Sequence, residues 1–280
     1  MRERRNKAIG IMIIIAIILC LAIAAVTGYI CLHKIVGDQK SIKEFDNIRD
    51  NVITFNDTDD DAKEDEAAPI EVDFEELWEI NKDVVAWIYI PCINVSYPVM
   101  HTDSNSAYVH TDIYGNYLYA GCLFLDSANL SDFQDPNSII YGHNMANGTM
   151  FGQLWHIVYR EAADENPYFW IITPQKAYKY KMFSAFEETS SSTAYTLFNH
   201  SLFTTEEKAA FLDWGKAQQA KTYVDFGTHR FVSSDRVVTL STCRGTGNDG
   251  GRTLVMGVCV NDSKEEKQTK TTEQEIVNAD

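Results

Sequence analysis

The hydrophobic pattern begins with one long apolar run, Ala8 to Leu32, that contains no charged residue. As a helix with about 1.5 Å of rise per residue, this run exceeds the roughly 30 Å of a bilayer's hydrocarbon core. A basic flank favours the cytoplasmic side of a membrane, and four basic residues precede the run: Arg2, Arg4, Arg5 and Lys7. We therefore expect a cytoplasmic tail (1–7) and a single-pass membrane anchor (8–32), with the rest of the chain extracellular.

A cleaved signal peptide is the alternative for this segment, because small residues around Ala24 suit a peptidase. The apolar part of a signal peptide usually spans about 7–15 residues. The run is longer than that, which favours the uncleaved anchor.

The pattern turns polar after the apolar run and again at the C-terminus. Residues 33–69 include an acidic stretch, Asn56–Glu66. Like charges at this density repel each other and bury no apolar surface, so we expect residues 33–69 to be an acidic, flexible stalk. Residues 262–280 are also polar, and we expect them to be a loose C-terminal tail.

Short apolar runs separated by Gly, Pro, Asn and Asp fill residues 70–261, which we take as the folded domain. They predict strands over 84–90, 120–125, 138–141, 168–173, 178–186, 236–240 and 253–260. Helical spacing predicts a short helix around Leu77 with Asp73 as N-cap, and two more helices over 150–159 and 205–221. Thr204 and Glu207 have the spacing of a capping box. A chain that is mainly β with few helices indicates a barrel or sandwich.

Composition excludes some classes of function. The formal net charge is −16, which disfavours binding to the phosphate backbone of nucleic acids. Six cysteines are too few for a disulfide scaffold, and none has the CxxC spacing of a structural zinc site. Cys92, Cys122 and Cys259 lie in or beside apolar strands, where we expect buried, inert thiols. We expect no metal and no cofactor.

Cys243 stands in a different setting. It ends the apolar run 237–243 and is followed by a loop rich in Gly, Asn and Asp, after which Arg252 begins the next strand. If the two strands form an antiparallel hairpin, Cys243 and Arg252 lie opposite each other at the base of the loop. A guanidinium there favours the nucleophilic thiolate and can stabilise the oxyanion of a tetrahedral intermediate.

A thiol nucleophile also needs a group that carries a proton. His143 follows the strand 138–141 through Gly142, so it can leave a strand end and point into a cleft. The histidines in polar stretches have no such setting: His101, His110, His200 and His229. Spacing alone leaves open whether His143 is catalytic.

Together these residues resemble the sortases of Gram-positive bacteria. Leu240-Ser241-Thr242-Cys243 is followed by Arg252, and Tyr141-Gly142-His143 lies upstream. The segment 141–145 (YGHNM), the segment 150–154 (MFGQL), the Ser in LSTC and a helix-bearing insertion over about 187–235 resemble class B. The resemblance covers about residues 71–260.

The resemblance implies a mainly β fold, with a sortase-type closed β-barrel, an N-terminal helix and a helical insertion before the cysteine strand. It implies a cysteine transpeptidase in which Cys243 attacks the Thr carbonyl of an NPxTN- or NPxTG-like sorting signal. His143 would protonate the leaving amine and deprotonate the incoming one, while Arg252 would stabilise the oxyanion. Arg244, next to the cysteine, is the other candidate guanidinium.

The resemblance also implies substrate-binding roles for Asn105, Tyr141 and Ser241, whose ordinary alternatives are a loop Asn, a strand Tyr and a Ser bonded within the sheet. The implied partners are secreted surface proteins with a C-terminal sorting signal, a lipid II-type peptidoglycan precursor that supplies the amine, and the membrane.

Two alternatives remain at this point. The first is an L,D-transpeptidase, which also uses Cys, His and Arg but carries an SxGC-type motif in place of LSTC. A papain-like hydrolase is excluded, because its Cys precedes its His in the chain. A membrane-tethered binding module, in which Cys243 is only structural, belongs to a different class.

Overall fold

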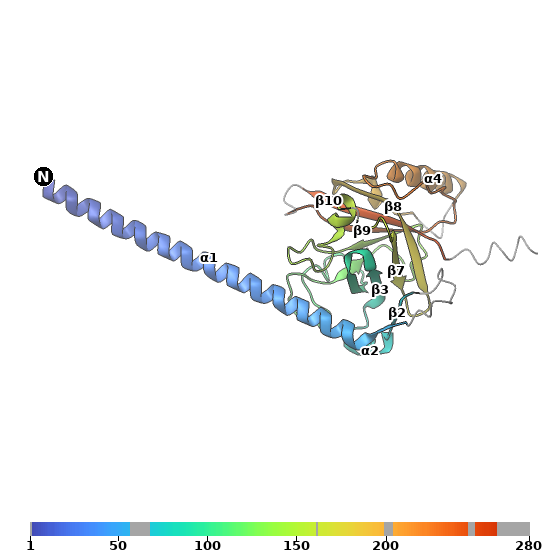
Figure 1. Cartoon of the computed structure of the whole chain (residues 1–280), viewed down its shortest axis with the longest axis horizontal. Helices are drawn as coiled ribbons and strands as arrows, with labels where there is room; N and C mark the ends of the chain where they lie inside the picture. Colours follow the sequence, from blue (N-terminus) through green and yellow to red (C-terminus); the bar gives the residue numbers. More distant parts are fainter. Residues whose placement is uncertain (1, 57–67, 161, 199–203, 246–249, 262–280) are drawn as a thin grey trace, which may run out of the picture. The chain divides into compact units, whose positions relative to one another are not determined.

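The computed structural model describes residues 2–56, 68–160, 162–198, 204–245 and 250–261 (Figure 1). The elements in chain order are α1 (Arg2–Val52), β1 (Ile53–Phe55), β2 (Ile70–Val72), α2 (Phe74–Ile80), β3 (Val84–Ile90), η1 (Pro91–Ile93), β4 (Val95–Met100), β5 (Leu123–Leu125), β6 (Asn137–Tyr141), α3 (Leu154–Tyr159), β7 (Tyr168–Ile172), β8 (Ala177–Thr189), η2 (Thr193–Tyr195), α4 (Thr205–Gln219), β9 (Val237–Cys243) and β10 (Gly251–Cys259).

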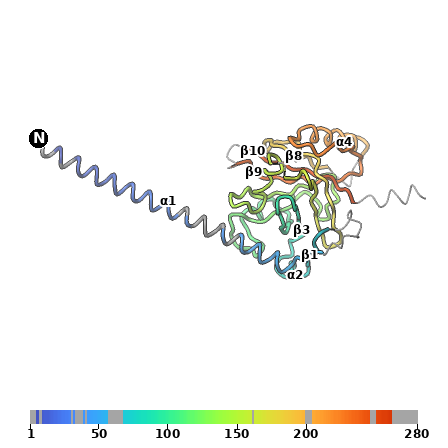
Figure 2. The backbone as a smooth tube through the Cα atoms, viewed as in Figure 1, coloured from blue at the N-terminus to red at the C-terminus, as the bar shows by residue number. Residues whose placement is uncertain are grey.

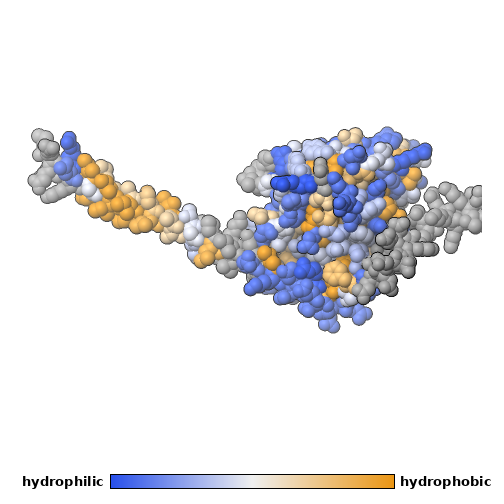
Figure 3. All heavy atoms as spheres, in the orientation of Figure 1, coloured by the Kyte–Doolittle hydropathy of each residue, from blue (hydrophilic) through white to orange (hydrophobic). Residues whose placement is uncertain are grey.

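Helix α1 contains the apolar run predicted from the sequence. Its segment Ile9–Tyr29 is long and apolar enough to cross a membrane, and large side chains such as Ile14 and Leu21 are exposed along it. Figure 3 shows this segment as a continuous hydrophobic band. The segment is consistent with a membrane anchor or a signal sequence.

The predicted flexible stalk over 33–69 is wrong for its first part. Helix α1 continues to Val52, and β1 then pairs antiparallel with β2. Phe45, Ile48 and Val52 are almost completely buried in the main core, so the compact unit begins at Phe45 and not at residue 70. The i, i+3, i+7 spacing of these residues is that of one helix face, but polar neighbours obscure it. The acidic residues 57–67 and the C-terminal residues 262–280 lie outside the described part.

The main sheet is a closed, mixed barrel of eight described strands in the order β10-β8-β7-β3-β4-β5-β6-β9. Most neighbours are antiparallel, but β4 pairs parallel with β5, and β6 pairs parallel with β9. Strands β8, β9 and β10 run side by side (Figures 1 and 2). The prediction of a mainly β closed barrel is therefore confirmed.

Most of the predicted elements are present, with shifted ends. Asp73 caps α2 by accepting a hydrogen bond from the Glu76 N–H. The helix predicted over 150–159 begins only at Leu154, because Met150 has a positive φ of 54°. Strand β4 was not predicted from the sequence, since Pro98 lies inside it and a proline argues against a central strand.

A second, smaller core joins the insertion between β8 and β9 to the barrel. Helix α4 begins with the predicted capping box of Thr204 and Glu207. Its Phe211 and Trp214 are buried, as expected, and pack with residues of β8 and β10 such as Phe186 and Met256. The insertion is therefore packed against the barrel beside strands β8 and β10.

A chain that begins at residue 70 should be less stable than one that begins at residue 42, because it lacks Phe45, Ile48, Val52 and β1. Truncating a single buried Ile or Phe side chain costs about 2–5 kcal/mol. Ile48→Ala in the longer chain should therefore lower the unfolding free energy in urea by an amount in this range. Asn47→Ala, one exposed position away, is the matched control and should change it by less than about 0.5 kcal/mol. Equal midpoints for the two chain lengths would contradict the assignment of 45–52 to the domain.

Candidate active site

The end of the β9–β10 hairpin places Cys243 beside Arg252. The two residues are direct partners in the antiparallel register, as predicted. Both are partly exposed, so a ligand can reach them. Residues directly opposite each other on neighbouring strands project to the same face, which puts the thiol and the guanidinium on one face of the sheet.

The parallel pairing of β6 with β9 brings His143 to the same place. Tyr141 is the partner of Ser241 in the register, and the Gly142 N–H donates to the Ser241 carbonyl at 3.1 Å. His143 and Cys243 each follow these partners by two positions and therefore lie at the same end of adjacent strands. Asn144 Nδ2 donates to the Gly245 carbonyl at 3.0 Å, and this hydrogen bond joins the segment that follows β6 to the segment that follows β9.

Gly142 permits this arrangement because, without a side chain, it lets neighbouring side chains pack closely against its backbone. A Cβ at this position would collide with the side chains of Leu123 and Phe151. The sequence suggested a glycine hinge, but Gly142 is not among the glycines with positive φ. The absent side chain, and not backbone freedom, is therefore what the position requires.

The imidazole of His143 sits in an aromatic stack. Its ring is stacked on His110 at 5.1 Å and on Tyr119 at 5.8 Å between centroids. Its Nε2 lies 2.8 Å from the Val109 carbonyl oxygen. A carbonyl only accepts, so Nε2 carries a proton and Nδ1 is the nitrogen left to exchange one.

Burial lowers the pKa of His143 below its usual 6.5, the positive charge of protonated His110 lowers it further, and the hydrogen bond to Val109 opposes both effects. The imidazole is therefore mostly neutral at pH 7. Nothing in the polar stretch around His110 indicated that its ring would stack on His143.

The two candidate guanidiniums have different partners. Arg244 Nη1 lies 3.4 Å from Glu187 Oε2, and its side chain is 44% exposed. Arg252 Nη1 donates to the Gly251 carbonyl at 2.9 Å. Burial raises the pKa of Tyr141 and of Tyr195, and the charge of Arg252 opposes this rise in both. Arg252 thus faces the residues around Cys243, whereas Arg244 is paired elsewhere.

The predicted substrate-binding residues converge on two groups that the sequence analysis missed. Asp126 Oδ2 accepts from Asn105 Nδ2 at 3.0 Å and from the Tyr141 hydroxyl at 2.9 Å. A 2.7 Å hydrogen bond joins Tyr195 Oη and Ser241 Oγ. Burial and the Asp126 carboxylate raise the pKa of Tyr141, so its hydroxyl remains a donor.

The rings of Tyr141 and Tyr195 are stacked, with 6.1 Å between their centroids. They connect the Asn105 side of the site to the Ser241 side. Asp126 directly follows strand β5, and a polar residue at a strand end is a signal that could have pointed to it. Tyr195 lies in the insertion, where no sequence signal distinguishes it.

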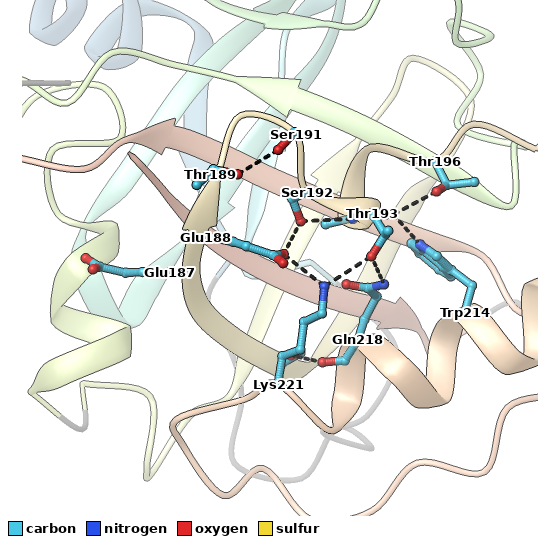
Figure 4. Close-up of polar contacts among 12 residues, drawn as sticks. Glu187, Glu188, Thr189, Ser191, Ser192, Thr193, Thr196, Trp214, Gln218 and Lys221 are labelled. Carbon is cyan, nitrogen blue, oxygen red and sulfur yellow. Dashed lines mark hydrogen bonds and ion pairs between the residues drawn. The ribbon is translucent and has the colours of Figure 1, made fainter. Parts of the chain in front are cut away.

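A polar network fixes the short η2 turn that carries Tyr195 (Figure 4). Lys221 Nζ donates to Glu188 Oε2 at 2.9 Å and to Thr193 Oγ1 at 3.1 Å. Trp214 Nε1 donates to the Thr193 carbonyl at 2.7 Å, and Ser192 donates to Glu188. Helix α4 therefore holds η2, and with it the position of the Tyr195 hydroxyl.

The other described thiols of the barrel lie away from this constellation. Burial raises the pKa of Cys92 to about 11, which keeps that thiol protonated at neutral pH. Cys122 is buried, and Cys259 is at the far end of β10 from Arg252. Cys243 is therefore the thiol that the fold combines with an imidazole and a guanidinium.

Comparison with known proteins agrees with this geometry. The model of the sortase domain family matches residues 88–260. A sortase B of Listeria monocytogenes is 29% identical over 187 residues, which cover 66% of this chain and 73% of the relative.

Two solved structures are similar. A Staphylococcus aureus sortase B–substrate complex has a TM-score of 0.59 and 25% identity, and the match covers 68% of this chain and 85% of that one. A sortase B in complex with triglycine has a TM-score of 0.60 and 24% identity, with 68% and 86% covered. The chain belongs to the sortase family, as a sortase B-like cysteine transpeptidase of cell-wall anchoring with an apolar N-terminal helix.

Proposed function

We propose that Cys243 is the nucleophile of the transpeptidation and that His143 and Arg252 act with it. The thiolate attacks the carbonyl carbon of the Thr in a sorting signal, and a C–S bond forms. The amide C–N bond breaks, and the leaving amine takes a proton from the His143 imidazolium. The product is a thioester on Cys243. The observation that carries this proposal is the double pairing of β9, with β6 on one side and β10 on the other.

In the second half-reaction an amine nitrogen attacks the thioester carbon. A C–N bond forms, the C–S bond breaks, and a proton from the nitrogen passes to neutral His143. This restores the thiolate and the imidazolium, so one group serves as acid and then as base. The lowered pKa of His143 supports the second role, because a neutral imidazole can accept the proton.

Arg252 is the proposed oxyanion-stabilising group. Both tetrahedral intermediates place a negative charge on the former carbonyl oxygen, and a fixed guanidinium beside the thiol stabilises it. The register partnership of Arg252 with Cys243 and the pairing of Arg244 with Glu187 both favour this choice.

The sorting signal would bind against Asn105, Tyr141 and Ser241. The hydrogen bonds that orient them, through Asp126 and Tyr195, support a preformed binding surface on the face of Cys243. From the class B resemblance of the segments around His143 and Cys243, we infer an NPxTN- or NPxTG-like signal in secreted surface proteins. S. aureus sortase B has itself been solved with a substrate. The triglycine complex of another sortase B supports an amine acceptor, which we propose to be a lipid II-type peptidoglycan precursor.

The location follows from the apolar segment of α1 and the basic residues that precede it. We propose that this segment is an uncleaved anchor in the cell membrane, with residues 1–7 in the cytoplasm and the catalytic unit outside. Finding mature protein in the medium with an N-terminus near residue 26 would contradict the anchor.

Cys243→Ala should abolish cleavage of a fluorogenic NPxTN-like peptide, because the other groups cannot form a thioester. The assay uses the full chain in detergent and follows fluorescence with time. Cys92→Ala is the matched control and should retain activity, since that thiol is protonated and partly buried. Equal cleavage by Cys243→Ala and the unaltered chain would exclude Cys243 as the nucleophile, whereas no cleavage by either protein would favour the membrane-tethered binding module.

Arg252→Lys should lower kcat/KM by about 10²-fold, because a point charge does not reproduce the planar guanidinium at an oxyanion. Arg244→Lys should retain most activity, since this side chain is 44% exposed and paired with Glu187. The reverse pattern would transfer the role to Arg244.

His110→Phe should raise the pKa of His143, because it keeps a stacked ring but removes the positive charge that lowers this pKa. An NMR titration of the His143 ring measures the shift. The corresponding pKa in the pH dependence of kcat/KM should move in the same direction. Because the pKa of His143 is lower in the folded chain than in the unfolded one, the unfolded chain binds this proton at a higher pH. Stability should therefore fall as the pH drops below about 6.5 towards the folded-state pKa. An unchanged pKa of His143 in the His110→Phe variant would contradict the electrostatic effect of His110 on this ring.

A further inference from the structure

A carboxylate lies beside the candidate guanidinium on the neighbouring strand. Glu188 of β8 is the direct cross-strand partner of Arg252 on β10, and Arg252 is the partner of Cys243 on β9. The three residues therefore form one row across the sheet, and side chains in such a row project to the same face. Glu188 has no part in either half-reaction.

This carboxylate is well placed to form an ion pair with Arg252. Residues directly opposite each other on antiparallel strands have Cβ atoms about 4.5–5.5 Å apart, which a Glu and an Arg side chain easily bridge. A paired carboxylate would occupy the N–H groups that the oxyanion needs. It would also add a negative charge beside the thiol, which disfavours the thiolate. A site with this order of residues therefore works best when Glu188 is kept off Arg252.

The Glu188 carboxylate is instead bound by Lys221, which lies two residues after α4. Its Oε2 accepts from Lys221 Nζ at 2.9 Å and from the Ser192 hydroxyl. Figure 4 shows the Glu188 side chain directed into this network. Burial raises the pKa of Glu188, but the hydrogen bonds from Lys221 and Ser192 outweigh this effect and lower the pKa below its usual value. Glu188 is therefore an ionised carboxylate whose charge Lys221 balances.

Arg252 is left without an acidic partner among the described residues. In that part of the chain its guanidinium makes one hydrogen bond, from Nη1 to the Gly251 carbonyl. A guanidinium has five N–H donors, so most of them remain available to a substrate. Burial raises the pKa of Tyr195, and the charges of all three residues of the row also act on its hydroxyl. The charge of Glu188 is thus close enough to matter at the site.

Lys221 is held in position by the helical insertion. Its Nζ also donates to Thr193 Oγ1 at 3.1 Å, and Gln218 Nε2 donates to the same oxygen at 3.0 Å. The ammonium lies 5.4 Å from the centre of the Phe186 ring. The side chains of Lys221 and Glu188 are 30% and 35% exposed, and ion pairs of such exposure contribute little to stability. The main effect of this pair is therefore on where the Glu188 charge lies.

We propose that Lys221 is a positioning residue for the reaction, because its ion pair with Glu188 keeps this carboxylate off Arg252 and leaves the guanidinium available to the oxyanion. This inference rests on the proposed roles of Cys243 and Arg252. Lys221 acts through Glu188 and needs no contact with the substrate. The insertion thereby supplies a charge on which the hairpin end depends.

Lys221→Met should lower kcat for a fluorogenic NPxTN-like peptide by about tenfold, as expected when a charge-assisted hydrogen bond to the oxyanion is weakened. The assay uses the full chain in detergent. Lys221→Arg keeps the positive charge and should retain most of the activity. Lys216→Met is the matched control on the same helix and should match the unaltered chain, since this lysine is 67% exposed and pairs with Asp213.

A double variant separates this role from a structural one. Lys221→Met with Glu188→Gln has no carboxylate to neutralise Arg252, so kcat should recover to within about threefold of the unaltered chain. Both variants lack the bond from Lys221 to Thr193, so any change in KM or thermal midpoint caused by a loosened η2 should persist in the double variant. A double variant as slow as Lys221→Met would overturn the proposal, and so would an unchanged kcat in Lys221→Met.

Alkylation of Cys243 by iodoacetamide tests the proposal without a sorting peptide. Its rate at pH 7, followed by peptide mass spectrometry, should fall about threefold in Lys221→Met, because the freed carboxylate disfavours the thiolate. The rate should recover in the double variant. If the unaltered chain cleaves no sorting peptide, the proposed function fails, and the alkylation rates decide this inference alone. Equal rates in the three proteins would then overturn it.

Discussion

The candidate active site depends on one constraint, the simultaneous pairing of β9 with two strands of opposite sense. Parallel pairing with β6 aligns Tyr141 with Ser241, and antiparallel pairing with β10 aligns Arg252 with Cys243. A slip of one residue in either ladder would turn its side chains to the other face. The closed barrel holds both registers, because β6 and β10 are themselves joined to further strands on their outer sides.

The helical insertion is tied into this arrangement by buried polar groups. Asn137, at the start of β6, donates to the carbonyls of Ala194 and Thr196 at 3.0 Å and accepts from Thr239 of β9 at 2.8 Å. The ion pair of Glu188 and Lys221 secures the same turn from the other side. Buried hydrogen bonds of this kind favour a single geometry, because breaking one leaves a polar group without a partner. The network thus positions Tyr195 on Ser241 without placing any catalytic group in the insertion.

The alternation of side chains gives the hairpin end two different chemical faces. Arg252 and Cys243 share one face with the Asp126-centred hydrogen bonds, whereas Glu187 and Thr242 share the other. Adjacent residues of one strand therefore carry different chemistry to opposite sides of the sheet.

The local pattern was sufficient to predict a mainly β barrel or sandwich, the helix caps, the hairpin and the pairing of Cys243 with Arg252. Each of these depends on residues close together in the chain, whose spacing and turn chemistry are visible in the sequence. The family resemblance narrowed the fold to a closed barrel and gave His143 the role that spacing had left open. It also added Asn105, Tyr141 and Ser241. It did not reveal Asp126, Tyr195 or the stacking of His110, because these residues meet the site only through long-range packing. The pattern also failed for residues 45–52, whose apolar face is sparse and gains meaning only when it contacts the core.

By itself, the sequence determined which side chains are candidates for the chemistry and where most of the strands and helices lie. Only the tertiary structure decided which side chains share a face, because that depends on the register between strands distant in the chain. The same register brings Glu187, Thr253 and Thr242 together on β8, β10 and β9, and no local spacing encodes that grouping.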